Sequence, residues 1–224
     1  MPVVIGNPDV EVLVTGYGTF GDFDENPAYA IVKTLPSKIQ LEQGRRIVLR
    51  VYPNPVRVAY RHVLDLVPQL YEQYPDVEYF IHVGVHDETS SYLLEKRARK
   101  GPYTRKDVDG RSFEPGTGDE KERWGKLPEE LWTGVDVDGI LEAMIAEREW
   151  DIDSSTDAGL FLCEFIYFNS MAAARGLRKD GRDLKGLFFH VPPEMSPEKI
   201  KTGQDTLVRV VREMAGSAHP PEKQ

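Results

Sequence analysis

The segment Ser155-Thr156-Asp157-Ala158-Gly159-Leu160-Phe161-Leu162-Cys163-Glu164-Phe165-Ile166 contains the single cysteine of this 224-residue chain. Residues 150–154, just before it, are predicted to form a short strand. Residues 165–175, which are rich in alanine and precede Gly176 as a C-cap, are predicted to form a helix. The segment therefore joins a strand to a helix, as connections in α/β folds do.

Cys163 lies near the start of that helix. The positive end of the helix dipole favours the thiolate over the thiol there, so the sulfur is expected to be a good nucleophile at neutral pH. The alternative is a buried cysteine that serves as a small hydrophobic side chain, because free cysteines are among the most buried residue types. Position alone leaves both interpretations open.

Strands and helices alternate along the rest of the chain. Further strands are predicted at residues 10–15, 46–52, 77–85 and 186–191. Helices are predicted at residues 28–35, 56–74, 137–149 and 197–215. Residues 77–85 are almost continuously apolar, which is typical of a central strand covered on both faces. The alternation predicts an α/β fold: a single-domain, three-layer α/β/α sandwich with a mostly parallel, twisted central sheet, of the phosphorylase or hydrolase type.

Four further details complete this scheme. The helix at 137–149 is expected to bury Ile140, Leu141, Met144 and Ile145. Residues 86–99 are expected to leave the central strand as a loop. Residues 100–134 are polar and rich in glycine and proline, which predicts a long loop region within the one domain, 1–224. Residues 216–224 are expected to be a loose tail.

The composition limits the function. The formal net charge is −9, which argues against broad binding to the nucleic-acid backbone. One cysteine excludes an internal disulfide and a cysteine-rich zinc site. The sequence contains no apolar run of about 20 residues to span a membrane and no secretory signal peptide, so we expect a cytoplasmic protein. The oligomeric state stays open, and a homo-oligomer is compatible with the sequence.

The first strand leads into Gly16-Tyr17-Gly18-Thr19-Phe20-Gly21. The spacing of its glycines matches neither the dinucleotide-binding nor the P-loop pattern. Its two aromatic side chains favour a loop that shapes a ligand pocket over a phosphate-binding loop.

Several chemically active side chains follow predicted strands. Glu95 follows the central strand, Cys163 opens a helix after the next strand, and His190 ends the last one. Ligands of open α/β sheets bind beyond the carboxyl ends of the strands. A thiol, an imidazole and a carboxylate at that edge match the nucleophile, base and orienting group of a catalytic triad, although a lone histidine at a strand end is more often structural.

Three motifs resemble the pyroglutamyl peptidase I family of cysteine peptidases, also called pyrrolidone carboxyl peptidases. They are Thr15-Gly16-Tyr17-Gly18-Thr19-Phe20-Gly21 with Asn26-Pro27, Ala158-Gly159-Leu160-Phe161-Leu162-Cys163, and Phe189-His190-Val191-Pro192. The resemblance implies removal of an N-terminal pyroglutamyl residue from peptides without a metal or cofactor. It also implies a triad of Cys163, His190 and Glu95, the last because Glu95-Lys96-Arg97-Ala98 is similar to a family stretch.

The resemblance implies further roles around this triad. Tyr17, Phe20 and Phe161 are expected to wall an apolar slot for the lactam ring, and Asn26 to brace the pocket. The backbone N–H of Arg105, with that of Cys163, is expected to stabilise the tetrahedral oxyanion.

Two departures from the family pattern motivate a second hypothesis. Residues 84–89 read Gly-Val-His-Asp-Glu-Thr where the family reads Gly-Gln-Ala-Gly-Gly-Arg, and Glu164 replaces an asparagine. A carboxylate beside the sulfur would raise the thiol pKa. The alternative is a weak or inactive homologue that binds pyroglutamyl or related cyclic amides without cutting them. A nucleoside phosphorylase-like transferase is a more distant option, since a fold alone does not fix function.

Overall fold

The computed structural model describes residues 9–21, 25–116, 118, 120–147, 149–178 and 181–216. Within them, one central sheet has seven strands in the order β2 (Lys38–Gln40), β3 (Arg46–Val51), β1 (Val10–Gly16), β4 (Tyr79–Val85), β9 (Lys185–Val191), β5 (Tyr92–Glu95) and β8 (Ile152–Ser155). The strands β3, β1, β4 and β9 run parallel, whereas β2 is antiparallel to β3 and β5 is antiparallel to β9. The prediction of a mostly parallel central sheet is confirmed.

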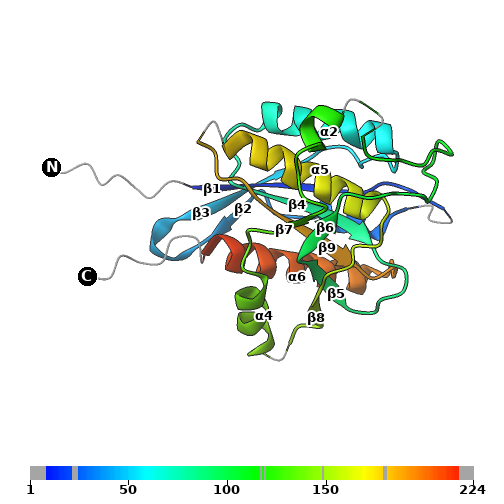
Figure 1. Ribbon diagram of the computed structural model, residues 1–224. Coiled ribbons are helices and arrows are strands. Elements are labelled where there is room, and N and C mark those ends of the chain that lie inside the picture. The colour runs from blue at the N-terminus through cyan, green and yellow to red at the C-terminus, as the bar shows by residue number, and fades with distance from the viewer. Residues whose placement is uncertain are drawn as a thin grey trace.

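Helices cover both faces of this sheet (Figure 1). One face carries α2 (Tyr60–Gln73) and α5 (Leu162–Leu177), whose side chains share one core with Phe80 and Phe188 of the sheet. The other face carries α1 (Pro27–Val32), α4 (Val137–Ile145) and α6 (Pro197–Gly216), which share a second core with Ile81 and Phe189. The three-layer α/β/α arrangement follows from strands that bury residues on both of their faces.

The strand β4 shows why this sequence builds a central strand. Six of its seven residues are buried, as its near-continuous apolar sequence predicted. Both of its neighbours, β1 and β9, are parallel to it. Its last residues, Gly84 and Val85, therefore reach the same edge of the sheet as Gly16 of β1 and Val191 of β9.

Residues 86–99 are not the loop that the sequence predicted. They contain β5 and the short strand β6 (Arg97–Arg99). The strand β5 is only four residues long and ends in a buried glutamate, so its sequence does not show the pattern that is typical of a strand. We had expected a loop after the central strand to carry Glu95 to the carboxyl edge of the parallel strands. Instead Glu95 is the last residue of β5, which runs antiparallel to β9.

Residues 100–134 are also more ordered than a long loop. They contain α3 (Lys121–Trp124) and β7 (Glu130–Trp132), which pairs with β6. The rings of Phe113 and Trp124 pack on Phe165 of α5, with centroid distances of 4.7 and 5.6 Å. The burial of aromatic rings against α5 thus holds in place a segment that its glycine and proline content predicted to be a loop.

The boundaries of three helices and the burial of one side chain differ from the predictions. The helix α5 begins at Leu162 and continues to Leu177, so Gly176 is helical and is not the C-cap. The helix α2 begins only at Tyr60, because Val56 pairs with Tyr17 and Ala59 is extended. The helix α1 ends at Val32. In α4 the side chain of Ile145 is 55% exposed rather than buried.

Two remaining features concern the periphery. Gly216 is the last residue of α6, and residues 217–224 of the expected tail lie outside the described residues. No helix in the described part of the chain is both long and apolar enough to cross a membrane.

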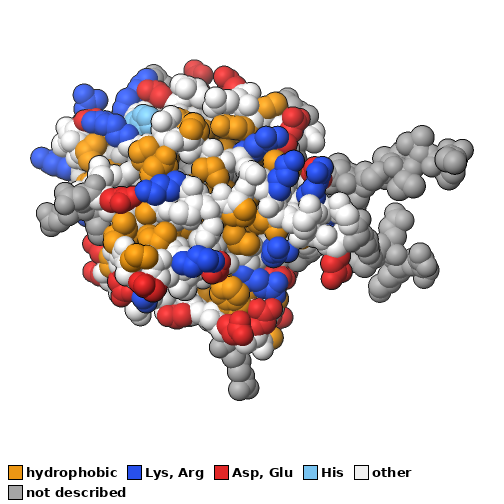
Figure 2. Space-filling model, turned by 180° about the vertical axis from the view of Figure 1, so that it is seen from behind, with side chains coloured by type: hydrophobic (Ala, Val, Ile, Leu, Met, Phe, Trp, Pro, Cys, Tyr) orange, Lys and Arg blue, Asp and Glu red, His pale blue; other side chains and the backbone are white. Residues whose placement is uncertain are grey.

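The face in Figure 2 shows acidic and basic side chains interspersed with small hydrophobic areas, so this face carries both signs of charge.

Candidate active site

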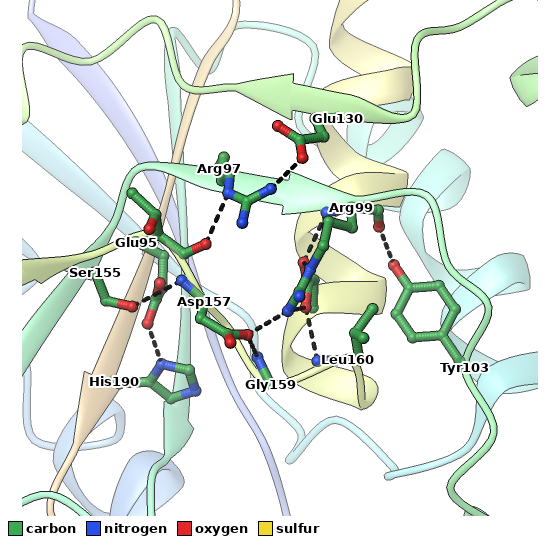
Figure 3. A network of polar contacts seen from close by, with 12 residues as sticks. Glu95, Arg97, Arg99, Tyr103, Glu130, Ser155, Asp157, Gly159, Leu160 and His190 are labelled. Carbon is green, nitrogen blue, oxygen red and sulfur yellow. Dashed lines mark hydrogen bonds and ion pairs between the residues drawn. The ribbon is translucent and has the colours of Figure 1, made fainter.

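The Glu95 carboxylate and the His190 ring form a buried pair. Oε1 of Glu95 lies 2.8 Å from Nδ1 of His190, and their side chains are 0% and 2% exposed. The register aligns Leu93 with His190 and Glu95 with Phe188. Alternate residues of a strand share a face, so the side chains of Glu95 and His190 lie on the same face of the sheet. They point toward each other in Figure 3.

Cys163 reaches the same face from the helix side. It lies in the first turn of α5, whose N-cap is Phe161. A Cβ atom placed on Gly84 would lie 2.9 Å from Sγ of Cys163 and 2.7 Å from the Phe188 ring. Gly84 is the register partner of His190 in the β4–β9 pair. The sulfur therefore lies against the strand beside His190, and the absence of a side chain at residue 84 makes room for it.

The surroundings of Cys163 favour the neutral form of its thiol. Burial raises the pKa of Cys163 to about 12, the negative charge of Glu95 adds to the rise, and the Arg105 guanidinium opposes it. This shift opposes the effect of the helix dipole, which we expected to favour the thiolate. No hydrogen bond joins Sγ to the His190 ring among the described residues. A neutral thiol needs a base to become nucleophilic, and hydrogen bonds of this kind often tighten only when substrate binds.

A cavity of about 350 Å³ opens beside the thiol. It is lined by Tyr17, Phe20 and Phe161, with Cys163 at its wall, as the sequence predicted. The rings of Phe20 and Phe161 have centroids 5.1 Å apart. A slot walled by aromatic rings suits a flat, uncharged ring, and its volume is at the lower end for small-molecule pockets.

Arg105 covers this slot with its side chain. Its guanidinium carbon lies 4.3 Å from the centroid of the Phe161 ring and 5.3 Å from that of Phe20, which are cation–π distances. The Tyr60 hydroxyl donates a hydrogen bond to the Arg105 carbonyl oxygen at 2.9 Å. The Asp107 carboxylate accepts one from the Tyr60 backbone N–H, so the segment that carries Arg105 is fixed to the start of α2.

Tyr17 and Asn26 hold the walls in place. The Tyr17 hydroxyl donates a hydrogen bond to the Leu162 carbonyl oxygen and so connects the first loop to the start of α5. Burial and the neighbouring Cys163 raise the pKa of Tyr17, which keeps this hydroxyl a donor. Asn26 is the N-cap of α1: its side chain accepts from the Ala28 N–H at 2.9 Å and donates to the Gly18 carbonyl at 2.8 Å. It also lines the cavity.

The altered residues 84–89 do not fill the cavity. Val85 and Asp87 line it, and the His86 ring contacts the His190 ring edge-on with a centroid distance of 5.2 Å. The site holds no arrangement typical of a bound metal: the described residues contain no group of three or more histidine, cysteine, aspartate or glutamate side chains that could hold one.

Sequence reasoning found only part of the environment of Glu164. Its negative charge adds to the rise in the pKa of Cys163, as we expected. The carboxylate is also fully buried and forms an ion pair with Arg99, with Oε1 2.7 Å from Nε, which the sequence did not predict. The side-chain hydrogen bond to Glu164 raises the pKa of Arg99, as expected of a tight pair. Nothing local in the sequence signals this pair, because its partners are 65 residues apart.

Comparison with known proteins gives a consistent result. A family model described as pyroglutamyl peptidase matches residues 10–216. Pyroglutamyl-peptidase 1 of Mus musculus is 30% identical over 210 residues, which cover 93% of this chain and 91% of the relative, and that of Homo sapiens is 29% identical over 208 residues, covering 92% and 90%. Among solved structures, a mutant pyrrolidone carboxyl peptidase of Pyrococcus furiosus has a TM-score of 0.75 at 20% identity and covers 94% of this chain and 100% of its own.

Proposed function

Because the chain belongs to the pyroglutamyl peptidase family, we propose that it removes an N-terminal pyroglutamyl residue from peptides through a triad of Cys163, His190 and Glu95. The observation that carries this proposal is the buried hydrogen bond between Glu95 and His190, on the sheet face where the Cys163 sulfur lies against Gly84. The three groups come from β5, β9 and the first turn of α5.

The first half of the reaction forms an acyl-enzyme. Glu95 accepts the hydrogen bond from Nδ1–H of His190, which leaves Nε2 as the proton acceptor. Nε2 takes the thiol proton as Sγ of Cys163 attacks the carbonyl carbon of the pyroglutamyl group. The tetrahedral intermediate then collapses, the C–N bond breaks, and His190 returns the proton to the departing amine.

The second half restores the enzyme. His190 takes a proton from water, the resulting hydroxide attacks the thioester carbonyl, and His190 returns that proton to the sulfur as the C–S bond breaks. The products are pyroglutamate and the Cys163 thiol. The backbone N–H groups of Cys163 and Arg105 donate hydrogen bonds to the oxyanion in both halves. These donors serve both steps because they carry no charge that changes during the reaction.

The aromatic slot determines which residue is accepted. Phe20 and Phe161, whose ring centroids are 5.1 Å apart, together form one aromatic wall for the lactam ring, and Tyr17 closes the slot toward the start of α5. A linear glutamyl residue would bring a charged ammonium group and a carboxylate into this slot, and their desolvation disfavours binding. The slot therefore selects the cyclised form.

A panel of reporter peptides tests the proposed function. Pyroglutamyl, prolyl and glutamyl conjugates of one chromogenic amine are compared at equal concentration, and binding of each is measured on the same sample. We expect cleavage of the pyroglutamyl conjugate alone. Binding of that conjugate without any cleavage would contradict the peptidase and support the binding module instead.

A further inference from the structure

The residue that follows the nucleophile is the centre of a polar network. The Glu164 side chain is fully buried, and its two oxygens accept four hydrogen bonds. Arg99 supplies three of them, from its backbone N–H at 2.7 Å, from Nε at 2.7 Å and from Nη2 at 2.8 Å. The fourth comes from the backbone N–H of Leu160 at 2.6 Å. Figure 3 shows Arg99 and Leu160 converging at this point.

Leu160 adopts a conformation that leucine rarely takes. Its φ is +46°, and it is the only residue other than glycine with a positive φ in the part of the chain that the structure describes. A branched side chain is disfavoured in this region, so surrounding contacts must hold it there. Gly159 before it also has a positive φ, +94°, and donates its N–H to Oδ1 of Asp157 at 3.1 Å. Asp157 in turn pairs with Arg99.

This turn directly precedes two parts of the site. The next residue, Phe161, forms a wall of the slot, and Cys163 follows two residues later in the first turn of α5. The conformation of Leu160 therefore determines the direction in which the chain enters α5. A small rotation here would move the sulfur away from Gly84, and a displacement near 1 Å can cost about a hundredfold in rate.

We propose that Glu164 is a positioning residue: anchored by Arg99, its carboxylate holds Leu160 in the left-handed conformation and so places Cys163 and Phe161 for the reaction. This role deepens the proposed function and rests on it. It goes beyond a favourable charge at a helix N-terminus, since any acidic residue in the first turn would supply that. The bonds of Glu164 reach outside the helix, to the turn before it and to β6.

The first test compares two glutamates that pair with arginines of the same strand. Glu164→Gln removes the charge and part of the acceptor capacity. Glu130→Gln, the matched control, removes the partner of Arg97 at a half-exposed surface pair that does not contact Leu160. We expect Glu164→Gln to lower kcat for the pyroglutamyl reporter by roughly ten- to a hundredfold, as a misplaced nucleophile would. We expect Glu130→Gln to leave kcat within about twofold of wild type, because an exposed ion pair contributes little.

A rescue experiment separates positioning from a general loss of stability. Asparagine tolerates a positive φ better than leucine does. In the Glu164→Gln background, Leu160→Asn is expected to recover kcat at least about threefold, because the turn then needs less support. The proposal is overturned if Glu164→Gln matches Glu130→Gln in kcat, or if Leu160→Asn gives no recovery.

Hydrogen exchange makes the test independent of the reporter. The Leu160 amide is expected to exchange faster in Glu164→Gln than in Glu130→Gln, and an unchanged rate would overturn the proposal even if the protein cleaved no pyroglutamyl peptide. A protein without turnover but with this difference would contradict the proposed function alone. If Glu164→Gln does not fold, Arg99→Lys replaces it, since lysine keeps the charge and loses the two-pronged contact.

Discussion

Oε1 of Glu95 lies 2.8 Å from Nδ1 of His190, although the two residues are 95 positions apart in sequence. Both side chains are buried, so the bond is shielded from water and fixes the orientation of the ring. This geometry directs Nε2 of His190 toward the role of proton acceptor. The pair is the part of the site on which the proposed mechanism most depends.

Replacing the orienting carboxylate tests that dependence. Glu95→Gln keeps the size of the side chain and can still accept one hydrogen bond, but it cannot stabilise the imidazolium that forms during attack. We expect kcat for the pyroglutamyl reporter to fall by roughly a hundredfold or more, the scale of general acid–base catalysis, with KM changed much less. Steady-state kinetics measure both, and a variant with wild-type kcat would show that Glu95 has no part in the reaction.

Gly84 tests the position of the sulfur. In Gly84→Ala the new methyl group would lie 2.9 Å from Sγ of Cys163 and 2.7 Å from the Phe188 ring, closer than atoms tolerate. We expect the thiol to be displaced and turnover to fall by at least about tenfold. Gly176→Ala is the matched control: it is helical with open space around it and should gain stability, by about 1 kcal/mol. Equal activities of the two variants would mean that Sγ does not react from this position.

The raised pKa of Cys163 predicts the pH dependence of alkylation. Burial and the charge of Glu95 disfavour the thiolate, so the fraction of thiolate grows as the pH rises toward about 12. The iodoacetamide rate of the free enzyme should therefore still rise at pH 10, by about tenfold for each pH unit, whereas a small reference thiol levels off near a pKa of about 8.5. A plateau already at pH 6 to 7 would instead indicate a resting thiolate–imidazolium pair.

The side chain and the backbone N–H of Arg105 have different proposed roles, and a substitution distinguishes them. Arg105→Ala removes the guanidinium from the rings of Phe20 and Phe161 but keeps the backbone N–H. A cation–π contact at such a half-open site is worth about 0.5–1 kcal/mol, so KM should rise only a few-fold while kcat stays close to wild type. A large loss of kcat would assign oxyanion stabilisation to the guanidinium rather than to the N–H group.

Parts of this protein are readable from its sequence and others are not. The apolar run of β4 and the motifs around Tyr17, Cys163 and His190 depend on local patterns, and these predicted the sheet and the lining of the slot. The strand β5 was missed because it is short and its glutamate is buried through a pairing made with distant His190. Long-range partners also explain why the ion pair between Glu164 and Arg99 was not predicted: the two residues are 65 positions apart, and the sequence does not show that they meet.

The most direct test of the nucleophile is the activity of Cys163→Ala. The variant is purified beside wild type, its fold is checked by circular dichroism, and both are assayed with the pyroglutamyl reporter at saturating concentration. The account predicts a folded variant with no cleavage above the uncatalysed rate, because no other group in the proposed reaction can form the thioester. Cleavage by folded Cys163→Ala at the wild-type rate would contradict it.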